Sequence, residues 1–455
     1  MEAVLARPVW PPKMQRIGSF ANWLLCWILL PNLAFCLMWL VGGPPRTMPI
    51  IITASMGLAL HRAPFPLKFG AFLVALSVST AFYISGLFNL SIFSLMASVR
   101  FASELRPEAS LQYVVAGAAL LLTVVIAGRS LQSSTVLAKP VLLVAAMAAG
   151  VALAVADRQA ADAHGGSYHR SASPGDPFES AISRSGIEGL ATGERHVMVV
   201  MVESMGKPAD AAIRKELINL WATPEVRSRY QVTSGDTLYY GSTTSGEMRE
   251  LCGRWGDYQE VIGRADTGCL PHRMKAKGYG TQAWHSFTGA FFDRTKWYPN
   301  IGFQTLRFGD SIMADGAQRC PGVFPGACDT DVPGQIAAAL KKAEKPQFLY
   351  WLTVNTHLPV LKHERLGTSD CKRFSTALDA QYPMICRLNQ ILDRTAGALA
   401  KEITAPDFPP TDILIVGDHI PPFYDRHHRT QFAPDRVPWI LLRADPAPKP
   451  GFTAA

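Results

Sequence analysis

The sequence has no concentrated basic run, although its formal net charge is +8. Its 44 lysines and arginines are scattered along 455 residues, whereas nucleic-acid-binding proteins gather such residues on one face or segment. The chain has no Cys-x-x-Cys pair, which argues against a zinc site built from cysteines. It has no internal repeat of about 20 to 50 residues, which argues against a solenoid or propeller. The scattered charge favours a basic membrane protein, with no nucleic-acid partner.

Apolar residues crowd the first third of the chain. They form five stretches, at residues 17–42, 48–60, 69–90, 111–127 and 140–156. A membrane-spanning helix needs about 20 apolar residues, and residues 48–60 are short for that role. The first stretch is longer than the apolar core of a signal peptide, and no small-residue cleavage site follows it. The sequence therefore predicts an N-terminal helical membrane domain, residues 1–156, with about five transmembrane helices.

Basic residues beside these stretches predict the orientation, because short cytoplasmic loops carry an excess of Lys and Arg. With five spans, three basic residues fall on one side: Arg46, Arg100 and Arg106. The larger group falls on the other side: Arg7, Lys13, Arg16, Arg62, Lys68, Arg129 and Lys139. The N-terminus is therefore expected in the cytoplasm, and everything after Ala156 outside it.

Cysteine usage agrees with that placement. Six of the cysteines lie in the C-terminal region, an even number that suits disulfides in an oxidising compartment. Many connectivities are open, and the most local one pairs Cys252 with Cys269, Cys320 with Cys328 and Cys371 with Cys386. Residues 157–194 are rich in small and polar residues, which is typical of a linker. This leaves residues 195–455 as the globular domain.

Two apolar runs in this domain end in polar residues of a similar kind. Residues 196–202 predict a strand buried on both faces of an α/β sheet, because their apolar residues do not alternate with polar ones, and Glu203 follows. Residues 413–416 predict a second such strand, followed by Asp418 and His419. Each end alone is also consistent with an ordinary turn. Ligands bind beyond the carboxyl ends of such strands, and these side chains suit Zn²⁺ or Mn²⁺, with Mg²⁺ possible.

Residues 241–247 read Gly-Ser-Thr-Thr-Ser-Gly-Glu and predict a turn that enters a helix. Hydroxyl residues at this position commonly cap the helix. The alternative is a threonine nucleophile, since the helix dipole favours an anion there and a bound metal activates a hydroxyl. Thr243 and Thr244 are both candidates for that role.

Three further segments supply candidate substrate contacts. His285 ends a predicted strand at residues 281–286, and His357 follows another at residues 347–354. Between them, Arg294 has the geometry to grip a phosphate with two hydrogen bonds, and Phe292 can pack against a glyceryl group, although core packing also explains these aromatics. His428 is a candidate for phosphate or for a second metal, or belongs to a solvated loop.

The residues of these motifs and their order along the chain resemble those of the lipoteichoic acid synthase group of the alkaline phosphatase and sulfatase superfamily. The motifs are Val-Glu-Ser-Met-Gly at 202–206, Gly-Ser-Thr-Thr-Ser-Gly-Glu at 241–247, residues 285–302, Asn-Thr-His at 355–357 and Gly-Asp-His at 417–419. The resemblance implies an extracytoplasmic α/β sulfatase-like domain. It also implies a transferase that takes phosphoglycerol or phosphoethanolamine from a phospholipid, through a phospho-threonine, to a hydroxyl acceptor.

The resemblance also assigns residues. The implied metal ligands are Glu203, Thr243, Asp418 and His419, with Thr243 as the nucleophile when the motif is aligned without gaps. The implied contacts to the phosphate and head group are His285, Arg294 and His357. Phe292 stands where the family usually has Trp, which implies altered stacking against a glycerol.

The cysteines resemble those of related phosphoethanolamine transferases of Gram-negative bacteria. This implies a multi-pass enzyme of the bacterial inner membrane with its catalytic domain in the periplasm. Its acceptor is then a cell-envelope glycan or glycolipid.

Two alternatives remain. The first is a metal-dependent sulfatase or phosphatase-type hydrolase of the same superfamily. A sulfatase needs a modifiable Cys or Ser in a Cys-x-Pro-x-Arg context, which Cys252-Gly253-Arg254 lacks. The second is a catalytically inactive binding or sensor domain on a membrane anchor. A binding domain has no need of the full Glu, Thr, Asp and His set.

Overall fold

The computed structural model describes residues 18–36, 45–87, 92, 96, 111–163, 172, 175–373, 375–423 and 426–444. The chain divides into two compact units, one containing most of the N-terminal apolar helices and the other containing the described residues from 172 onward. Five of the basic residues used above to predict the orientation lie outside the described residues: Arg7, Lys13, Arg16, Arg100 and Arg106.

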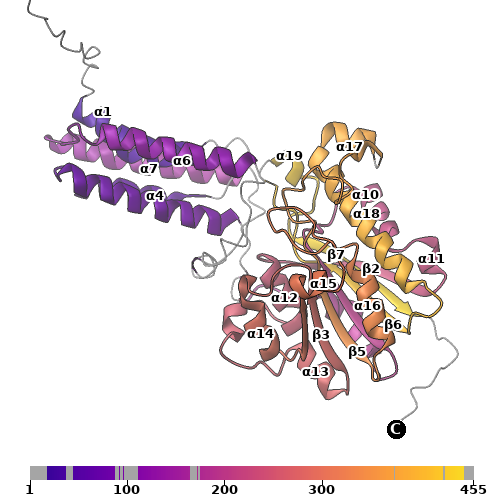
Figure 1. Ribbon diagram of the computed structural model, residues 1–455. Helices are drawn as coiled ribbons and strands as arrows, with labels where there is room; N and C mark the ends of the chain where they lie inside the picture. The colour runs from indigo at the N-terminus through magenta and orange to yellow at the C-terminus, as the bar shows by residue number, and fades with distance from the viewer. Residues whose placement is uncertain are drawn as a thin grey trace, which may run out of the picture. The chain divides into compact units, whose positions relative to one another are not determined.

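Within the described residues, each of the N-terminal apolar stretches forms helix (Figure 1). The helices are α1 (Ser19–Leu24), the π-helical turn η1 (Leu25–Leu29), α2 (Leu30–Cys36), α3 (Thr47–Ala59), α4 (Phe65–Leu87), α6 (Leu111–Ser130) and α7 (Pro140–Ala163). Small residues let them approach closely. A Cβ added at Gly150 would lie 2.9 Å from the Cβ of Ala54.

Two of the described helices are long and apolar enough to cross a membrane, Phe65–Gly86 and Pro140–Ala160. The other apolar helices are shorter, namely Ser19–Phe35, Thr47–Ala59 and Val114–Ser130. The five predicted stretches therefore all contain helix, but two of them meet the length and composition of a span.

The C-terminal unit is an α/β sandwich around a seven-stranded sheet of order β2-β7-β6-β1-β5-β3-β4. The strands are β1 (His196–Val202), β2 (Tyr230–Leu238), β3 (Gly280–His285), β4 (Thr305–Phe308), β5 (Gln347–Leu352), β6 (Thr411–Gly417) and β7 (Arg436–Ala444). β1 lies in the centre and pairs in parallel with β5 and β6, whereas β7 is antiparallel to both of its neighbours. The predicted buried strands at residues 196–202 and 413–416 are therefore confirmed.

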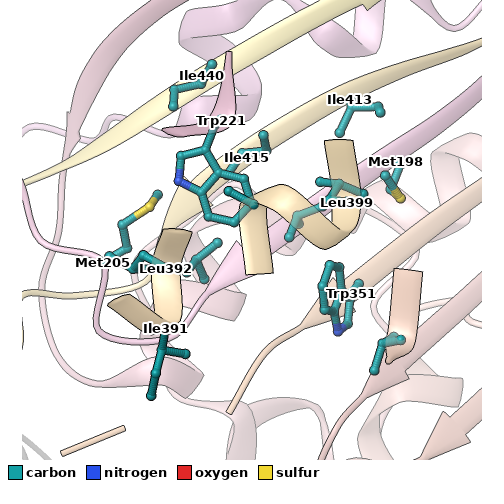
Figure 2. Packing of buried hydrophobic residues seen from close by; sticks show 14 of the residues in the cluster. Met198, Met205, Trp221, Trp351, Ile391, Leu392, Leu399, Ile413, Ile415 and Ile440 are labelled. Carbon is teal, nitrogen blue, oxygen red and sulfur yellow. The ribbon is translucent and has the colours of Figure 1, made fainter. Parts of the chain in front are cut away.

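Alternate residues of β1 enter two separate cores, because successive side chains of a strand point to opposite faces. Met198, Val200 and Val202 pack with α10 (Ala211–Trp221), α16 (Val332–Lys341) and α18 (Pro383–Ile403). Figure 2 shows this core, with Trp221 and Leu399 beside the strand residues. Val197, Val199 and Met201 pack on the other face with α12 (Thr243–Cys252), α13 (Leu270–Ala276) and α14 (Arg294–Asn300). Burial on both faces explains why β1 shows no alternation.

The remaining short helices lie in the connections. They are α8 (Ala181–Ser185), α9 (Ile187–Leu190), α11 (Pro224–Arg227), η5 (Tyr258–Val261), η6 (Phe291–Asp293), α15 (Gly309–Ala314), η7 (Cys371–Arg373), α17 (Thr376–Gln381) and α19 (Arg426–Arg429). Helices α8 and α9 fall inside the stretch expected to be a linker. Ala181, Ile182 and Ile187 are buried in the second core, so this part of the chain packs on the sheet unit.

Three disulfides join the cysteines of the C-terminal unit. The bonds are Cys252–Cys269, Cys320–Cys328 and Cys371–Cys386. This is the most local of the connectivities that the sequence left open, and the prediction of disulfides is confirmed.

Candidate active site

The carboxyl ends of β1 and β6 bring two acidic residues together. The strands pair in register, with Val202 opposite Gly417, so Glu203 and Asp418 leave the sheet side by side. Ser204 has a positive φ of 57°, and its backbone N–H donates to Asp418 Oδ1 at 2.8 Å. Glu203, Asp418 and His419 are all buried, and one potential ligand atom from each lies within 4.8 Å of the others.

Thr243 joins this group from the first turn of α12. Its Oγ1 donates to Glu203 Oε2 at 2.9 Å and lies 3.3 Å from His419 Nε2. Thr244 instead has its Oγ1 3.4 Å from Ser242 Oγ. The helix approaches closely because Gly246 has no side chain, since a Cβ there would lie 3.2 Å from Asp418 Cα. The structure thus brings Thr243, rather than Thr244, to the acidic group.

The charge of this group favours a bound cation. Burial and the Glu203 charge raise the pKa of Asp418 to about 7. Burial works against a charged imidazole at His419, yet Asp418 and Glu203 raise its pKa to about 9. Burial also opposes the ionisation of Glu203, but the hydrogen bond and charge of His419 lower its pKa. These shifts show that the two buried carboxylates do not both ionise freely without positive charge beside them, which a divalent cation would supply in place of the His419 proton.

The donor atoms also fit a metal ion. Asp418 Oδ2 is buried and accepts no hydrogen bond from the described residues, although His419 Nε2 lies 3.4 Å away. His419 Nδ1 is 2.8 Å from the Ile420 carbonyl oxygen, which leaves Nε2 directed to the group. Two carboxylates, an imidazole nitrogen and a hydroxyl form a mixed oxygen and nitrogen set of the kind that Zn²⁺ and Mn²⁺ accept.

Two histidines, His285 (buried) and His357 (half-buried), lie at the ends of neighbouring strands on the same edge. His285 ends β3 with Nδ1 3.1 Å from the Leu352 carbonyl oxygen. His357 lies beyond β5 with Nδ1 2.7 Å from the Leu358 carbonyl oxygen. Burial lowers the pKa of both imidazoles. Both rings are therefore neutral at pH 7, with Nδ1 donating to the backbone and Nε2 left as a proton acceptor.

Arg294 lies in a buried ion pair, which the sequence analysis did not foresee. Its Nη2 donates to Glu247 Oε2 at 2.8 Å, and its Nη1 donates to the Phe291 carbonyl oxygen at 3.2 Å. The hydroxyls of Tyr298 and Tyr350 also donate to Glu247. Several N–H donors of Arg294 therefore already bind the Glu247 carboxylate and the Phe291 carbonyl oxygen, so a phosphate would share this guanidinium with Glu247.

The last two sequence candidates pack against aromatic rings. Phe292 has a φ of 56° and its ring centroid lies 5.7 Å from that of Tyr258. The His428 ring is 5.1 Å from the Phe423 ring and 5.3 Å from the Tyr382 ring. The contact of Phe292 agrees with aromatic packing, and His428 lies half-buried in the short helix α19 rather than in a solvated loop.

Sequence reasoning missed three buried polar residues around the site. Glu247 lies inside the threonine motif but was used only as a helix marker. Arg249 donates from Nη2 to the Gly417 carbonyl oxygen at 2.8 Å and from Nη1 to that of Asp418 at 3.1 Å. Asp329 binds the chain after β3 and after β5. No local pattern marks the contacts of Arg249 with Gly417 and Asp418, or those of Asp329, because these partners are distant in sequence.

A parallel-rich α/β sheet with acidic residues, an imidazole and a helix-borne threonine at its carboxyl edge defines a class of metal-dependent enzymes. The family model described as Sulfatase matches residues 195–449. The chain therefore belongs to the sulfatase family, and the superfamily predicted from the motifs is confirmed.

The chain is also similar to several known proteins. It is 25% identical over 272 residues to a putative cyclic beta-1,2-glucan modification protein of Rhizobium meliloti (strain 1021), a match that covers 55% of this chain and 40% of that relative. Among solved structures, the lipoteichoic acid synthase LtaP of Listeria monocytogenes matches with a TM-score of 0.43 and 14% identity, over 60% of this chain and 73% of that one. The Streptococcus pyogenes phosphoglycerol transferase GacH, in complex with sn-glycerol-1-phosphate, matches with a TM-score of 0.38 and 15% identity, over 57% of this chain and 73% of that one.

Proposed function

We propose that this protein is a membrane-anchored, metal-dependent transferase that moves a phosphoglycerol or phosphoethanolamine group from a phospholipid. The acceptor is a hydroxyl of a cell-envelope glycan or glycolipid. The observation that carries the proposal is the Thr243 hydroxyl, buried at a helix N-terminus between Glu203 and His419. A mere helix cap has no need of a buried carboxylate pair and an imidazole around it.

Thr243 is the proposed nucleophile. Its Oγ1 forms a bond to the phosphorus of the donor head group, and the bond from phosphorus to the diacylglycerol oxygen breaks. The hydroxyl proton of Thr243 passes through its hydrogen bond to Glu203 and on to the departing diacylglycerol oxygen, so that diacylglycerol leaves as a neutral alcohol. A divalent cation held by Glu203, Asp418 and His419 would favour the threonine alkoxide and offset charge on the phosphoryl oxygens. The N-terminus of α12 favours the same anionic charge.

The second step regenerates the enzyme. The acceptor hydroxyl attacks phosphorus, and the bond to Thr243 Oγ1 breaks. His285 and His357 present neutral Nε2 atoms, because each Nδ1 is committed to a backbone carbonyl. One of them takes the acceptor proton, which is then returned to Thr243 Oγ1 and restores the hydroxyl. Arg294 contributes positive charge to the phosphoryl oxygens while Glu247 holds it in place.

The proposed organisation is a membrane domain of five helices at residues 1–156 and a catalytic domain at 195–455. Residues 157–194 connect the two, and α8 and α9 in this segment pack on the sheet unit. The catalytic domain lies in the periplasm of a bacterial cell, and the helices lie in the inner membrane. Three disulfides support an oxidising compartment. The relative named as a glucan modification protein supports a glycan acceptor.

The test is mass spectrometry of the purified full-length enzyme after incubation with phosphatidylglycerol or phosphatidylethanolamine, Zn²⁺ or Mn²⁺, and no acceptor. A glycerophosphoryl or phosphoethanolamine adduct on Thr243 is the expected result. Thr243→Ala should lose the adduct, whereas the matched control Thr244→Ala should retain it. Head-group release with no adduct on any threonine favours the hydrolase alternative, and an adduct on Thr244 contradicts the choice of nucleophile.

A further inference from the structure

A disulfide-closed loop packs between the two strand ends that precede the site histidines. Cys320 and Cys328 close this loop, and Asp329 follows immediately. Asp329 is only 1% exposed. Neither the metal group nor the nucleophile uses this carboxylate, so its burial needs another explanation.

The hydrogen bonds of Asp329 reach both strand ends. Oδ1 accepts from Ser286 Oγ at 2.5 Å, and Ser286 follows His285 directly. Oδ2 accepts from the backbone N–H groups of Val354 at 3.0 Å and Asn355 at 2.7 Å. These two residues lie between β5 and His357. One carboxylate thus fixes the chain beside each histidine.

Backbone contacts of the same loop reinforce this arrangement. The Ala327 N–H donates to the Ser286 carbonyl oxygen at 2.7 Å, and the Asp329 N–H donates to Asn355 Oδ1 at 2.8 Å. Phe324, at the middle of the loop, lies with its ring centroid 4.1 Å from that of His357. The contacts of Asp329 and of this loop therefore all lie within three residues of His285 or His357, or on His357 itself.

We infer that Asp329 is a positioning residue for phosphoryl transfer, which acts by fixing His285 and His357 relative to each other. The disulfide loop holds Asp329 in place. This inference rests on the proposed function, because it assigns those histidines to the transferring group. Reactions of this kind depend on position, and a misplacement of about 1 Å costs roughly a hundredfold in rate.

The test is a mutant cycle in the full-length enzyme. Asp329→Asn keeps the side-chain volume but weakens the acceptor of three donors, and we expect adduct formation on Thr243 at saturating donor to slow by about ten- to a hundredfold. The donor concentration for half-maximal rate should change little. A variant that is only less stable would keep its rate per folded molecule at a temperature well below its melting point.

The decisive comparison places Asp329→Asn in a His285→Gln/His357→Gln background. If Asp329 acts through the histidines, Asp329→Asn should slow adduct formation by less than about twofold in that background, because the effects of coupled residues are not additive. Asp412→Asn is the matched control, since Asp412 is also buried and accepts a backbone N–H, from Ala444 at 2.9 Å. It lies near the opposite end of β6 from Asp418, and we expect it to leave the rate unchanged.

The inference is overturned if the rate of adduct formation in Asp329→Asn stays within about twofold of the wild-type rate. It is also overturned if Asp329→Asn slows that rate by the same factor in both backgrounds. Failure of the proposed function is a separate outcome, in which the wild type forms no adduct from either phospholipid. The cycle is then measured on hydrolysis of bis(4-nitrophenyl) phosphate, which reports on the same phosphoryl site. Absence of both activities contradicts the function and the inference together.

Discussion

The buried pair of Glu247 and Arg294 gives the sharpest energetic prediction. Glu247 is fully buried and Arg294 is 2% exposed, and Tyr298 and Tyr350 complete the acceptor set of the carboxylate. Glu247→Gln keeps the shape but leaves the guanidinium without a counter-charge. Breaking one side of a buried ion pair costs roughly 3–5 kcal/mol. At roughly 2–4 °C per kcal/mol, the melting temperature of the C-terminal unit should fall by roughly 6–20 °C.

The assay is thermal unfolding of the full-length protein in detergent at pH 7, followed by tryptophan fluorescence. Arg294→Met should also destabilise the unit, because it leaves the carboxylate buried and unpaired. The double variant should lose less than the two single losses together, since it removes both charges. Glu188→Gln is the exposed control, because its pair with Arg273 is about one-third exposed, and it should cost less than about 1 kcal/mol. A Glu247→Gln protein that melts within about 2 °C of the wild type would refute the reasoning.

Three further predictions concern the metal, pH and a disulfide. Chelation should abolish adduct formation and lower the melting temperature, because a ligand of the native state stabilises it; metal-free protein, verified by elemental analysis, that keeps both properties would contradict the metal site. Burial lowers the pKa of His196 to about 4, so the unfolded state binds its proton first on acidification, and His196 alone should contribute a loss of about 2 kcal/mol of stability between pH 7 and pH 5. His196→Gln should therefore lose less stability over this range than the wild type by that amount, whereas the exposed-site variant His363→Gln should lose as much as the wild type, as read from melting curves at each pH. Replacing Cys252 and Cys269 by Ala should lower the free energy of unfolding by about 3 kcal/mol, and an unchanged melting curve would argue against that bond in the native protein.

Local sequence was sufficient for several elements of this fold. β1 and β6 are apolar over most of their length and are followed by polar residues. The sequence therefore predicts both the position of each strand and the polar residues that follow it. The disulfides join cysteines only 8 to 17 residues apart, which favours the most local pairing. The helix that begins at Thr243 follows Gly and hydroxyl residues, as helix starts commonly do.

Other features carried no local signal. Arg294 looked like a free phosphate ligand, because the sequence does not reveal that Glu247, 47 residues earlier, lies against it. Residues 157–194 looked like a linker, because two short helices with few apolar residues do not produce a periodic pattern. Their burial depends on the second core and on Glu250, which accepts the N–H groups of Ala181 and Ile182.

The sequence by itself determined the strand ends, the residue types at the carboxyl edge and the family, because each depends on contiguous residues. Tertiary structure alone decided which threonine faces Glu203, which partner holds Arg294 and why Asp329 is buried. Those outcomes depend on the parallel register of β1 and β6 and on the docking of α12 and of the Cys320–Cys328 loop on the sheet edge. Such contacts join residues far apart in the chain, and their geometry is fixed only when the two cores pack on both faces of the sheet.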